Sequence, residues 1–248
     1  MTATFEETVR RLAGVQGWLR DDQARRLWEA AGSLEPPATV VEIGSYHGRS
    51  AIVMASGARQ GVDIVAIDPH AGNDRGPQQI HGTAEEGEDD HRMFRSNLER
   101  AGVADRIRHV RRPSADAGPA VRGRVDLLYI DGAHRYRPAH DDIAQWGARV
   151  APGGTLLIHD AFSAVGVTLA ILRRLVLGRD FRYRGRVGSL AEYHREPLRG
   201  RARLANAAGQ LAELPWFARN LMIKVATVLH LPWIARLLGH RRGDTWPY

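Results

Sequence analysis

The chain of 248 residues contains no cysteine, and this absence restricts its chemistry. Without thiols it has neither a disulfide nor a thiolate metal site, so carboxylate, imidazole or carbonyl groups must hold any metal ion. Lysine is almost missing as well, because Lys224 is the only lysine and arginine supplies the other basic side chains. We draw no function from this bias.

Long apolar runs are also missing. In the C-terminal part, charged residues leave at most residues 225–235 uncharged between them, which is too short to cross a bilayer. Residues 1–30 carry interspersed charges and lack the apolar core of a secretory signal. With 44% hydrophobic and 25% charged residues, the composition is that of a globular protein. We therefore expect a cytoplasmic globular protein.

Charge is distributed unevenly along the chain. Residues 1–164 hold 20 basic and 23 acidic side chains, whereas residues 165–248 hold 15 basic and 5 acidic ones, a net charge of +10. The basic character therefore belongs to the C-terminal third, where it suits an anionic partner.

Short apolar runs alternate with segments that suit helices. This alternation predicts an α/β fold with a doubly wound, mostly parallel sheet, closed by an antiparallel strand pair around Gly188. A capping box at Thr4–Glu7 opens the first of two N-terminal helices within residues 4–32, the second spans Asp21–Ala31, and another helix is expected at Val165–Leu177. The seven predicted strands are Thr39–Ile43, Asp63–Ile67, Ile107–Val110, Val125–Ile130, Thr155–Ile158, Phe181–Val187 and Ser189–His194.

The first chemical signal is a glycine-containing turn after the first strand, Val40-Val-Glu-Ile-Gly-Ser-Tyr-His-Gly-Arg-Ser50. Gly44 and Gly48 allow a ligand to approach the backbone closely, and the following helix offers free N–H groups, so a nucleotide-like ligand fits there. Asp68 ends the next strand, where it is placed to accept hydrogen bonds from ribose hydroxyls. Alternatively, the glycines only form a tight turn and Asp68 caps a loop.

Polar side chains follow the fourth and fifth predicted strands. Val125-Asp-Leu-Leu-Tyr-Ile-Asp-Gly-Ala-His134 delivers Asp131 and His134, and Gly153-Gly-Thr-Leu-Leu-Ile-His-Asp160 delivers His159 and Asp160. Because parallel strands end at one edge of a sheet, these groups should converge beside the glycine turn. Taken singly, the aspartates suit helix caps and His134 a structural histidine, but their convergence favours catalysis.

These motifs resemble class I S-adenosylmethionine-dependent methyltransferases of the macrocin O-methyltransferase type, which are metal-dependent enzymes that modify sugars and glycosides. The resemblance covers residues 38–195 and rests on Glu42-Ile-Gly-Ser-x-x-Gly-Arg-Ser50, Asp131-Gly-Ala-His134 and Gly153-Gly-x-x-x-x-His-Asp160. It implies a Rossmann-like methyltransferase fold and bound S-adenosylmethionine. The implied cofactor residues are Glu42, Gly44, Ser45, Gly48, Ser50, Asp68, Ser114 and Asp131.

The resemblance also implies a divalent metal, Mg²⁺ or Mn²⁺, held by Asp131, His159 and Asp160, with His134 as the general base. His159 departs from the pattern, because the glycoside-modifying relatives are expected to carry a carboxylate there. Magnesium prefers oxygen ligands, so either the imidazole lies outside the direct ligands or the site accepts a transition ion such as manganese.

This chemistry suits a hydroxyl acceptor. An aliphatic alcohol is a poor nucleophile until it loses its proton or its oxygen is bound by a metal. A cation beside Asp131 and Asp160 lowers the pKa of the hydroxyl, and His134 can take the proton because imidazole titrates near working pH. We therefore predict a metal-assisted O-methyltransferase acting on a saccharide, glycoside or glycolipid-type hydroxyl, carried by a small molecule or an oligosaccharide.

Four other residues are weaker site candidates. Ser114 and Asp116 follow the third strand, where such folds contact the adenine ring, although Ser114 also suits a helix N-cap. We interpret Asp141 and Asp142 as solvated or structural and only as fallback metal ligands.

A long polar insertion is expected at residues 72–90, after the second strand. With His70, His81 and His91 it forms either a flap over the acceptor or a solvated loop before the next helix. No motif within it identifies the acceptor.

Residues 200–248 are predicted to form a basic, amphipathic helical tail outside the methyltransferase domain of residues 1–199. Two interpretations remain open. The tail packs on the core or across a homodimer, or residues 215–240 contact the inner face of the membrane peripherally, with Trp216 and Trp233 inserted and arginines near anionic lipid.

Three other functions compete with O-methylation. An N-methyltransferase on nucleic acid would use the basic C-terminal third, but Asp131-Gly-Ala-His134 stands where an Asn/Asp-Pro-Pro-aromatic motif belongs, so no nucleic-acid partner is expected. A non-catalytic, membrane-associated binding protein of the same fold leaves Asp131, His134 and Asp160 unexplained. The glycine spacing disfavours a nicotinamide oxidoreductase.

Overall fold

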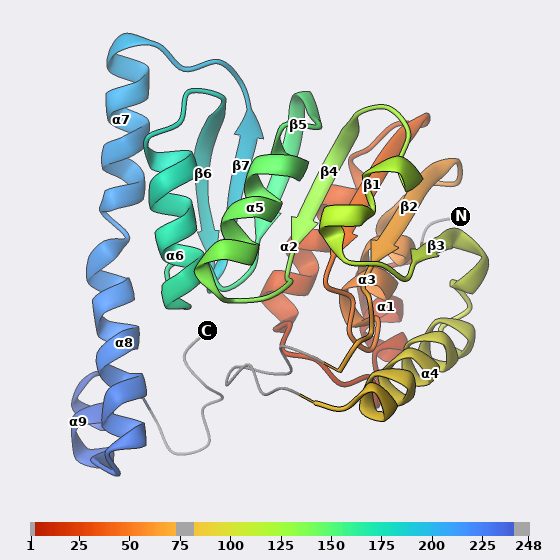
Figure 1. The fold of residues 1–248 in the computed structure, drawn as a ribbon, viewed down its shortest axis with the longest axis horizontal. Coiled ribbons are helices and arrows are strands. Elements are labelled where there is room, and N and C mark those ends of the chain that lie inside the picture. The colour runs from red at the N-terminus through yellow and green to blue at the C-terminus, as the bar shows by residue number, and fades with distance from the viewer. Residues whose placement is uncertain (1–2, 73–81, 241–248) are drawn as a thin grey trace.

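The computed structural model describes residues 3–72 and 82–240, which build a seven-stranded sheet in the order β3-β2-β1-β4-β5-β7-β6 (Figure 1). β7 runs antiparallel to its neighbours β5 and β6, and the pairs from β3 through β5 are parallel. The predicted fold class is confirmed. The strands are β1 (Ala38–Ile43), β2 (Val62–Ile67), β3 (Ile107–Val110), β4 (Val125–Ile130), β5 (Val150–Ile158), β6 (Phe181–Val187) and β7 (Leu190–Arg195).

Helices cover both faces of this sheet (Figure 1). One face packs against α1 (Phe5–Arg11), α2 (Asp21–Gly32), α3 (Arg49–Gly57) and α4 (Ala84–Arg100). The other face packs against α5 (Tyr136–Gly147) and α6 (Val165–Ile171), which continues as a π-helical turn over Leu172–Val176. The chain reverses its winding direction between β1 and β4, so their carboxyl ends border the crevice where ligands bind in such sheets.

Alternate residues of the central strands enter opposite cores. Val40 of β1 packs with the α2–α3 layer, whereas Val41 packs with the α5–α6 layer, and Leu127 and Leu128 of β4 divide in the same way. Strands buried on both faces are apolar at nearly every position, which is why they appear in the sequence as continuous apolar runs.

The first helix begins as predicted. The hydroxyl oxygen of Thr4 accepts a hydrogen bond from the Glu7 backbone N–H (3.2 Å), and the Glu7 carboxylate accepts one from the Thr4 N–H (2.8 Å). This reciprocal pair satisfies two of the N–H groups that a helix start leaves free.

The acidic run Glu85–Asp90 does not lie in a loop, so that part of the predicted insertion is wrong. It forms the first turns of α4, which begins at Ala84 because Thr83 and Glu86 make a second capping box. Acidic residues near a helix N-terminus are favourable for the helix dipole. His81 and the rest of the predicted flap, residues 73–81, lie outside the described residues.

The C-terminal segment is helical, as predicted, over α7 (Gly200–Leu211), α8 (Leu214–Val228) and α9 (Pro232–Leu237). Asn206 of α7 binds the β6 backbone, accepting from the Tyr183 N–H (2.7 Å) and donating to the Phe181 carbonyl (3.1 Å). α8 and α9 share a small apolar core around Ile223, Ala226 and Ala235. Nowhere in residues 3–72 and 82–240 is a helix both long and apolar enough to cross a membrane.

Candidate active site

A cavity of about 310 Å³ opens at the carboxyl ends of β1, β2, β4 and β5. This volume is at the lower end of the usual range for small-molecule pockets. The segment of residues 16–19, between α1 and α2, also lines it. The predicted site residues that line the cavity are Gly44, Ser45, Ser50, Asp68, Ser114, Asp131, His134, His159 and Asp160.

Gly44 and Gly48 serve the packing of the turn itself. Both have positive φ angles, +85° and +84°. A Cβ on Gly44 would lie 2.2 Å from the Asp131 carbonyl oxygen, and one on Gly48 would lie 3.1 Å from the Phe94 ring. The two glycines therefore allow the turn to fit against β4 and α4, whereas the sequence argument assigned them to close approach of a ligand.

Glu42 lies at the end of β1 and is fully buried. Its two carboxylate oxygens accept hydrogen bonds from the hydroxyls of Ser45 (2.7 Å) and Ser50. Burial raises the pKa of Glu42 to about 8, against the lowering effect of these two hydrogen bonds. Glu42 does not line the cavity. Its role is to hold Ser45 of the turn and Ser50 of α3, which do line it.

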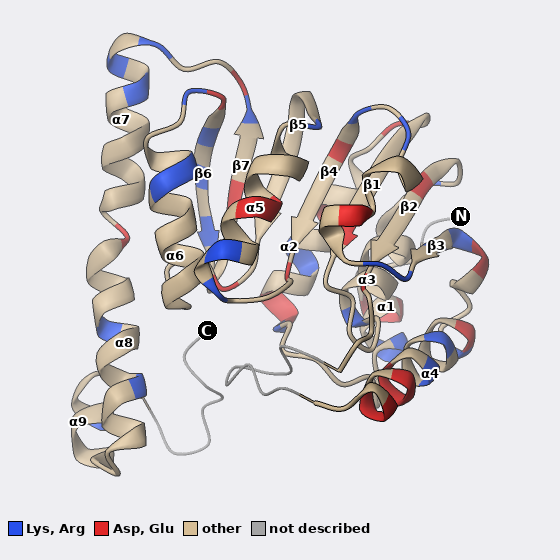
Figure 2. Cartoon of the chain, viewed as in Figure 1, with Lys and Arg blue, Asp and Glu red and all other residues tan. Residues whose placement is uncertain are grey.

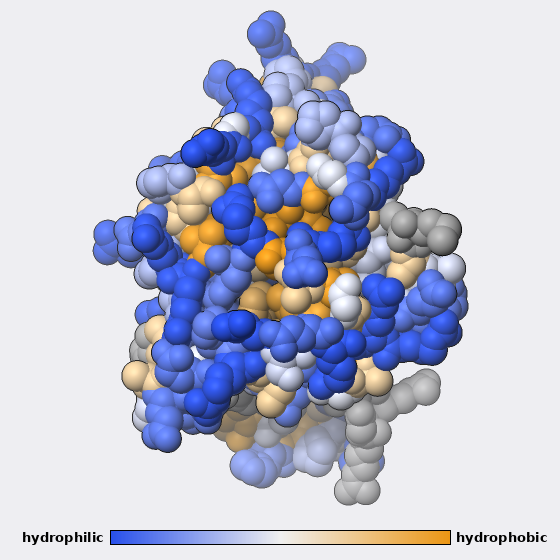
Figure 3. Space-filling model, turned by 90° about the vertical axis from the view of Figure 1, so that its right-hand side faces the viewer, coloured by the Kyte–Doolittle hydropathy of each residue, from blue (hydrophilic) through white to orange (hydrophobic). Residues whose placement is uncertain are grey.

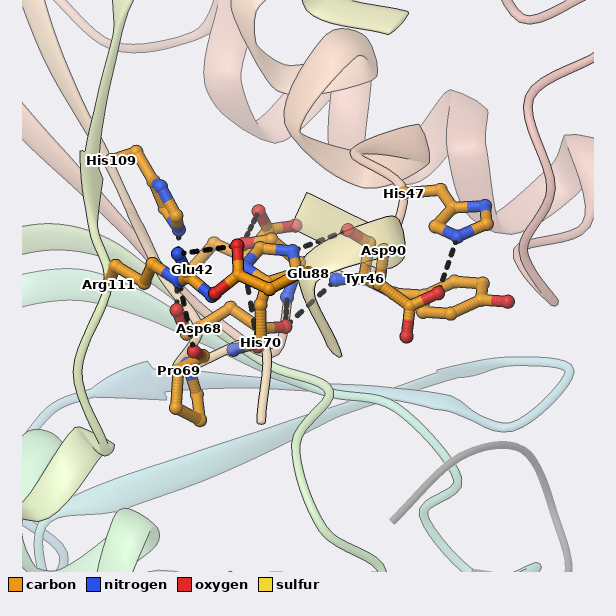
Figure 4. A network of polar contacts seen from close by, with 11 residues as sticks. Glu42, Tyr46, His47, Asp68, Pro69, His70, Glu88, Asp90, His109 and Arg111 are labelled. Carbon is orange, nitrogen blue, oxygen red and sulfur yellow. Dashed lines mark hydrogen bonds and ion pairs between the residues drawn. The ribbon is translucent and has the colours of Figure 1, made fainter. Parts of the chain in front are cut away.

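Asp68 holds the same turn from β2. One of its carboxylate oxygens accepts from the backbone N–H groups of Ser45 (2.8 Å) and Tyr46 (2.9 Å), and the other accepts from the N–H of His70 (2.8 Å). Figure 4 shows these contacts together. Asp68 therefore caps a loop, as the alternative interpretation held, while it also faces the cavity.

Histidines form a second layer beside this turn. The rings of His70, His91 and His109 lie 5.1–5.3 Å apart, and Phe94 packs against His70 and His109. Burial, together with the neighbouring His70 and His91, lowers the pKa of His109 to about 4, so its ring is neutral near pH 7. His70 and His91 are part of this ring cluster beside the glycine turn.

α4 is also tied to the turn. The His47 ring lies 2.9 Å from an Asp90 carboxylate oxygen (Figure 4), and the Asn97 side chain donates to the His47 carbonyl (2.9 Å). Asp90, expected in the polar insertion, is thereby a buried partner of the turn.

The four polar residues after β4 and β5 converge as predicted. His134 Nε2 lies 3.0 Å from Asp160 Oδ2, and His159 Nδ1 lies 3.2 Å from Asp131 Oδ1 and 3.7 Å from Asp160 Oδ1. The Tyr129 hydroxyl donates to Asp131 Oδ2 (2.8 Å). Two imidazoles and two carboxylates therefore form one connected cluster at the cavity wall.

Burial and charge act in opposite directions in this cluster. Burial disfavours a charged imidazole, but the Asp160 carboxylate outweighs it at His134, so the pKa of His134 is raised. The charges of Asp131 and Asp160 likewise raise the pKa of His159 well above its ordinary value. Burial would raise the pKa of Asp160, yet the two histidines hold it below its usual range.

The backbone is strained at the same place. Tyr46, His70 and Asp160 line the cavity and have φ angles of +44°, +44° and +54°, in the left-handed region that non-glycine residues rarely adopt. Each costs about 1–2 kcal/mol, and such residues cluster at functional sites. The strain independently marks this edge of the sheet.

Sequence reasoning missed Gln23 of α2, which is fully buried. Its Oε1 atom faces His159 Nε2 (3.3 Å), and its Nε2 atom donates to the Ser189 hydroxyl (3.1 Å). Gln23 thus links an N-terminal helix to the cluster and to the β6–β7 turn. Nothing in its sequence surroundings signals this contact across more than a hundred residues.

Ser114 and the buried Asp142 form a hydrogen-bonded pair beside the cavity. The Ser114 hydroxyl donates to Asp142 Oδ1, and burial raises the pKa of Asp142 to about 6. Both residues line the cavity, so Asp142, interpreted from sequence as structural, belongs to the site, whereas Asp116 does not line it. The sequence signal that could have identified Asp142 is an acidic residue on the buried face of α5.

A formed metal centre is not seen in the described part of the chain: no group of three or more His, Cys, Asp or Glu side chains there is arranged to hold an ion. Two atoms of the cluster, His159 Nδ1 and Asp160 Oδ1, are nevertheless buried without a well-aligned hydrogen bond within the described structure, although His159 Nδ1 lies within ion-pair distance of Asp131 and Asp160. Such atoms are costly unless something binds them.

Comparison with known proteins places this site in context. Residues 41–161 match the family model described as "Methyltransferase domain". The chain is 32% identical over 149 residues to "Catechol O-methyltransferase" from Mycobacterium tuberculosis, an alignment that covers 60% of this chain and 58% of the relative. The chain thus spans less than two thirds of that curated relative.

Solved structures share the fold. The cofactor-bound protein Rv0187 from MTB has a TM-score of 0.54 at 24% identity, covering 76% of this chain and 89% of that one. An O-methyltransferase from Bacillus cereus in complex with SAH has a TM-score of 0.51 at 17% identity, covering 77% and 90%. The seven-stranded sheet with its flanking helices is the Rossmann-like fold of these methyltransferases.

Proposed function

We propose that this chain is an S-adenosylmethionine-dependent O-methyltransferase, with His134 as the general base. The observation that carries the proposal is the His134–Asp160 pair, 3.0 Å apart, at the wall of a cavity that also contains the glycine turn after β1. The match of residues 41–161 to a methyltransferase family and the catechol O-methyltransferase relative support the same activity.

The cofactor belongs in the cavity beside the β1 turn. Ser45, Ser50, Asp68 and Ser114 line it and offer hydroxyl and carboxylate groups, while Gly44 keeps the turn in place. Bound S-adenosylmethionine would supply an electrophilic methyl group on a sulfonium. Glu42 and Gly48 support the turn without lining the cavity. Asp131, just after β4, lines the cavity opposite the turn.

His134 accepts the acceptor's proton in this proposal. Its Nε2 donates to Asp160 Oδ2, which fixes the ring orientation and leaves Nδ1 as the nitrogen that takes the hydroxyl proton. Asp160 then stabilises the imidazolium, as a carboxylate does in other oriented His–Asp pairs. As a base His134 acts from its neutral form, and because its pKa is raised this form becomes populated at a higher pH than for an ordinary histidine.

A divalent cation, Mg²⁺ or Mn²⁺, is a further part of the proposal. Asp131, His159 and Asp160 would hold it through two carboxylates and one neutral imidazole, with His159 Nδ1 and Asp160 Oδ1, which make no well-aligned hydrogen bond, among the donor atoms. A cation there would lower the pKa of the acceptor hydroxyl. His159 favours a transition ion over magnesium, because an imidazole nitrogen stands where a carboxylate oxygen was expected.

Two classes of methyl acceptor fit the proposal. The resemblance to glycoside-modifying enzymes favours a saccharide, glycoside or glycolipid hydroxyl, and the catechol O-methyltransferase relative favours an aromatic one. Both are hydroxyls on small molecules and both suit His134. The alternative of nucleic-acid N-methylation has no support beyond the basic charge of residues 165–248.

Calorimetry with S-adenosylhomocysteine tests the cofactor first, in EDTA and then with Mg²⁺ or Mn²⁺. Micromolar binding is expected, and no binding under any condition would contradict the methyltransferase proposal. Transfer of a labelled methyl group to a panel of glycosides, glycolipids and catechols then tests O-methylation. If turnover in EDTA equals turnover with metal, the cation is excluded while the role of His134 stands.

A further inference from the structure

The exposed face of α8 is apolar. Side chains 38–67% exposed recur three and four residues apart on it: Leu221, Met222, Val225, Val228 and Leu229. The opposite face is buried through Asn220, Ile223 and Ala226. On α9, Trp233 and Leu237 are 56% and 78% exposed. A helix that is apolar on both its buried and its exposed face calls for a partner other than water.

These seven exposed side chains, named here the α8–α9 apolar surface, lie in a segment without negative charge. Residues 214–240 contain no Asp or Glu, but they include Arg219, Lys224 and Arg236. In Figure 2 the ribbon of α8 and α9 is coloured for basic residues and not for acidic ones, whereas α4 carries both signs. On the side of the molecule that carries α4 and β3, hydrophilic residues surround an apolar area (Figure 3).

This surface could bind a second copy of the chain or a lipid bilayer, and its charge favours the bilayer. In a symmetric dimer built on α8 and α9, the exposed Arg236 would approach an interface in which residues 214–240 offer no carboxylate to pair with it. An anionic lipid surface supplies both an apolar layer and negative headgroups, and exposed tryptophan suits the boundary between them.

α9 and the C-terminal end of α8 lie at the end of the molecule where the cavity opens. The arrows of β1, β2 and β4 point toward the end of the molecule where α9 and the lower half of α8 lie (Figure 1). Lys224 of α8 donates to the Ser163 carbonyl (3.1 Å), just after β5, and the charge of Asp160 acts on its ammonium group. α8 is therefore joined to the segment that carries the cluster.

We propose that α8 and α9 dock this protein on an anionic lipid bilayer, with Trp233 and the exposed stripe of α8 in the interface. α9, docked in this way, lies at the end of the molecule toward which β1, β2 and β4 point. In one respect this deepens the proposed function and rests on it: the methyl acceptor is an amphiphile whose hydroxyl is presented by the bilayer. Docking itself requires no catalysis.

Flotation of the full chain with vesicles tests the docking. The wild type should float with vesicles of equal parts phosphatidylglycerol and phosphatidylcholine, and much less with phosphatidylcholine alone or in high salt. The triple variant Leu221→Gln, Val225→Gln, Leu229→Gln should lower the bound fraction at least about tenfold, because it removes three inserted apolar side chains. A wild type that does not float, or a triple variant that floats equally, overturns the proposal.

A matched control replaces equally exposed apolar side chains elsewhere, Met93→Gln, Leu177→Gln and Leu204→Gln, and should float like the wild type. Circular dichroism checks that both triple variants fold. Should the α8 variant not fold, Trp233→Leu serves instead: quenching of tryptophan fluorescence by brominated lipid should fall, and unchanged quenching would contradict insertion.

Two further readouts separate the alternatives. If the wild type sediments as a dimer without floating and the α8 variant is a monomer, the surface binds a second copy and the docking proposal is wrong. S-adenosylhomocysteine calorimetry on the same samples reports on the proposed function alone, so a protein that floats without binding the cofactor retains the docking and loses the methyltransferase assignment.

Discussion

Replacing Glu42 with Gln should make the protein more stable at neutral pH. Glu42 is fully buried and its pKa is raised from 4.5 to about 8, so the folded state binds a proton there that the unfolded state has released. The stability associated with protonated Glu42 is complete below pH 4.5 and is lost as the pH rises toward 8. The loss is about 1.4 kcal/mol per pH unit, or about 3 kcal/mol at pH 7.

Urea unfolding of the two proteins at pH 5, 6, 7 and 8 measures this effect. The glutamine keeps the shape of the side chain and can still hydrogen-bond Ser45 and Ser50, but it does not titrate. The difference between the free energies of unfolding of E42Q and wild type should therefore widen as the pH rises. If the two stability–pH curves run parallel, Glu42 does not carry the raised pKa and the reasoning fails.

Three further predictions concern the site. Gly44→Ala should abolish S-adenosylhomocysteine binding, because its Cβ would clash with the Asp131 carbonyl. It should also lower the free energy of unfolding by more than the roughly 1–2 kcal/mol that left-handed strain costs. The control Gly153→Ala, where φ is +80° and the space is open, should lose only that strain energy. His134→Gln should lower kcat about 10²–10⁴-fold in the methyl-transfer assay while calorimetry finds cofactor affinity nearly unchanged; equal turnover would exclude it as the base. Gln23→Ala should lower kcat but leave the KM for S-adenosylmethionine unchanged, since Gln23 faces the cluster through His159; a changed KM with an unchanged kcat would contradict this positioning role.

Much of this architecture could be predicted because its signals are local. Buried parallel strands produce apolar runs, and polar residues at their carboxyl ends meet at one edge, so Asp131, His134, His159 and Asp160 could be brought together without coordinates. Gln23 could not be predicted, because a contact between α2 and the end of β5 depends on how a helix packs on the sheet. The start of α4 at Ala84 differs from the predicted insertion because the capping box at Thr83 begins a helix inside a stretch whose polar composition is that of a loop.

The glycine turn and the polar cluster after β4 and β5 are coupled through the backbone. Gly44 donates its N–H to the Ile67 carbonyl (2.9 Å), Asp131 donates its N–H to the Ile43 carbonyl (2.8 Å), and no Cβ can be inserted between Gly44 and Asp131. A ligand that orders the β1 turn therefore also limits the position of Asp131. Since Asp131 in turn contacts His159 and Tyr129, cofactor binding and the arrangement of the polar cluster should change together. The motif glycine is required at Gly44 because two strands of the protein meet there, whichever ligand fills the cavity.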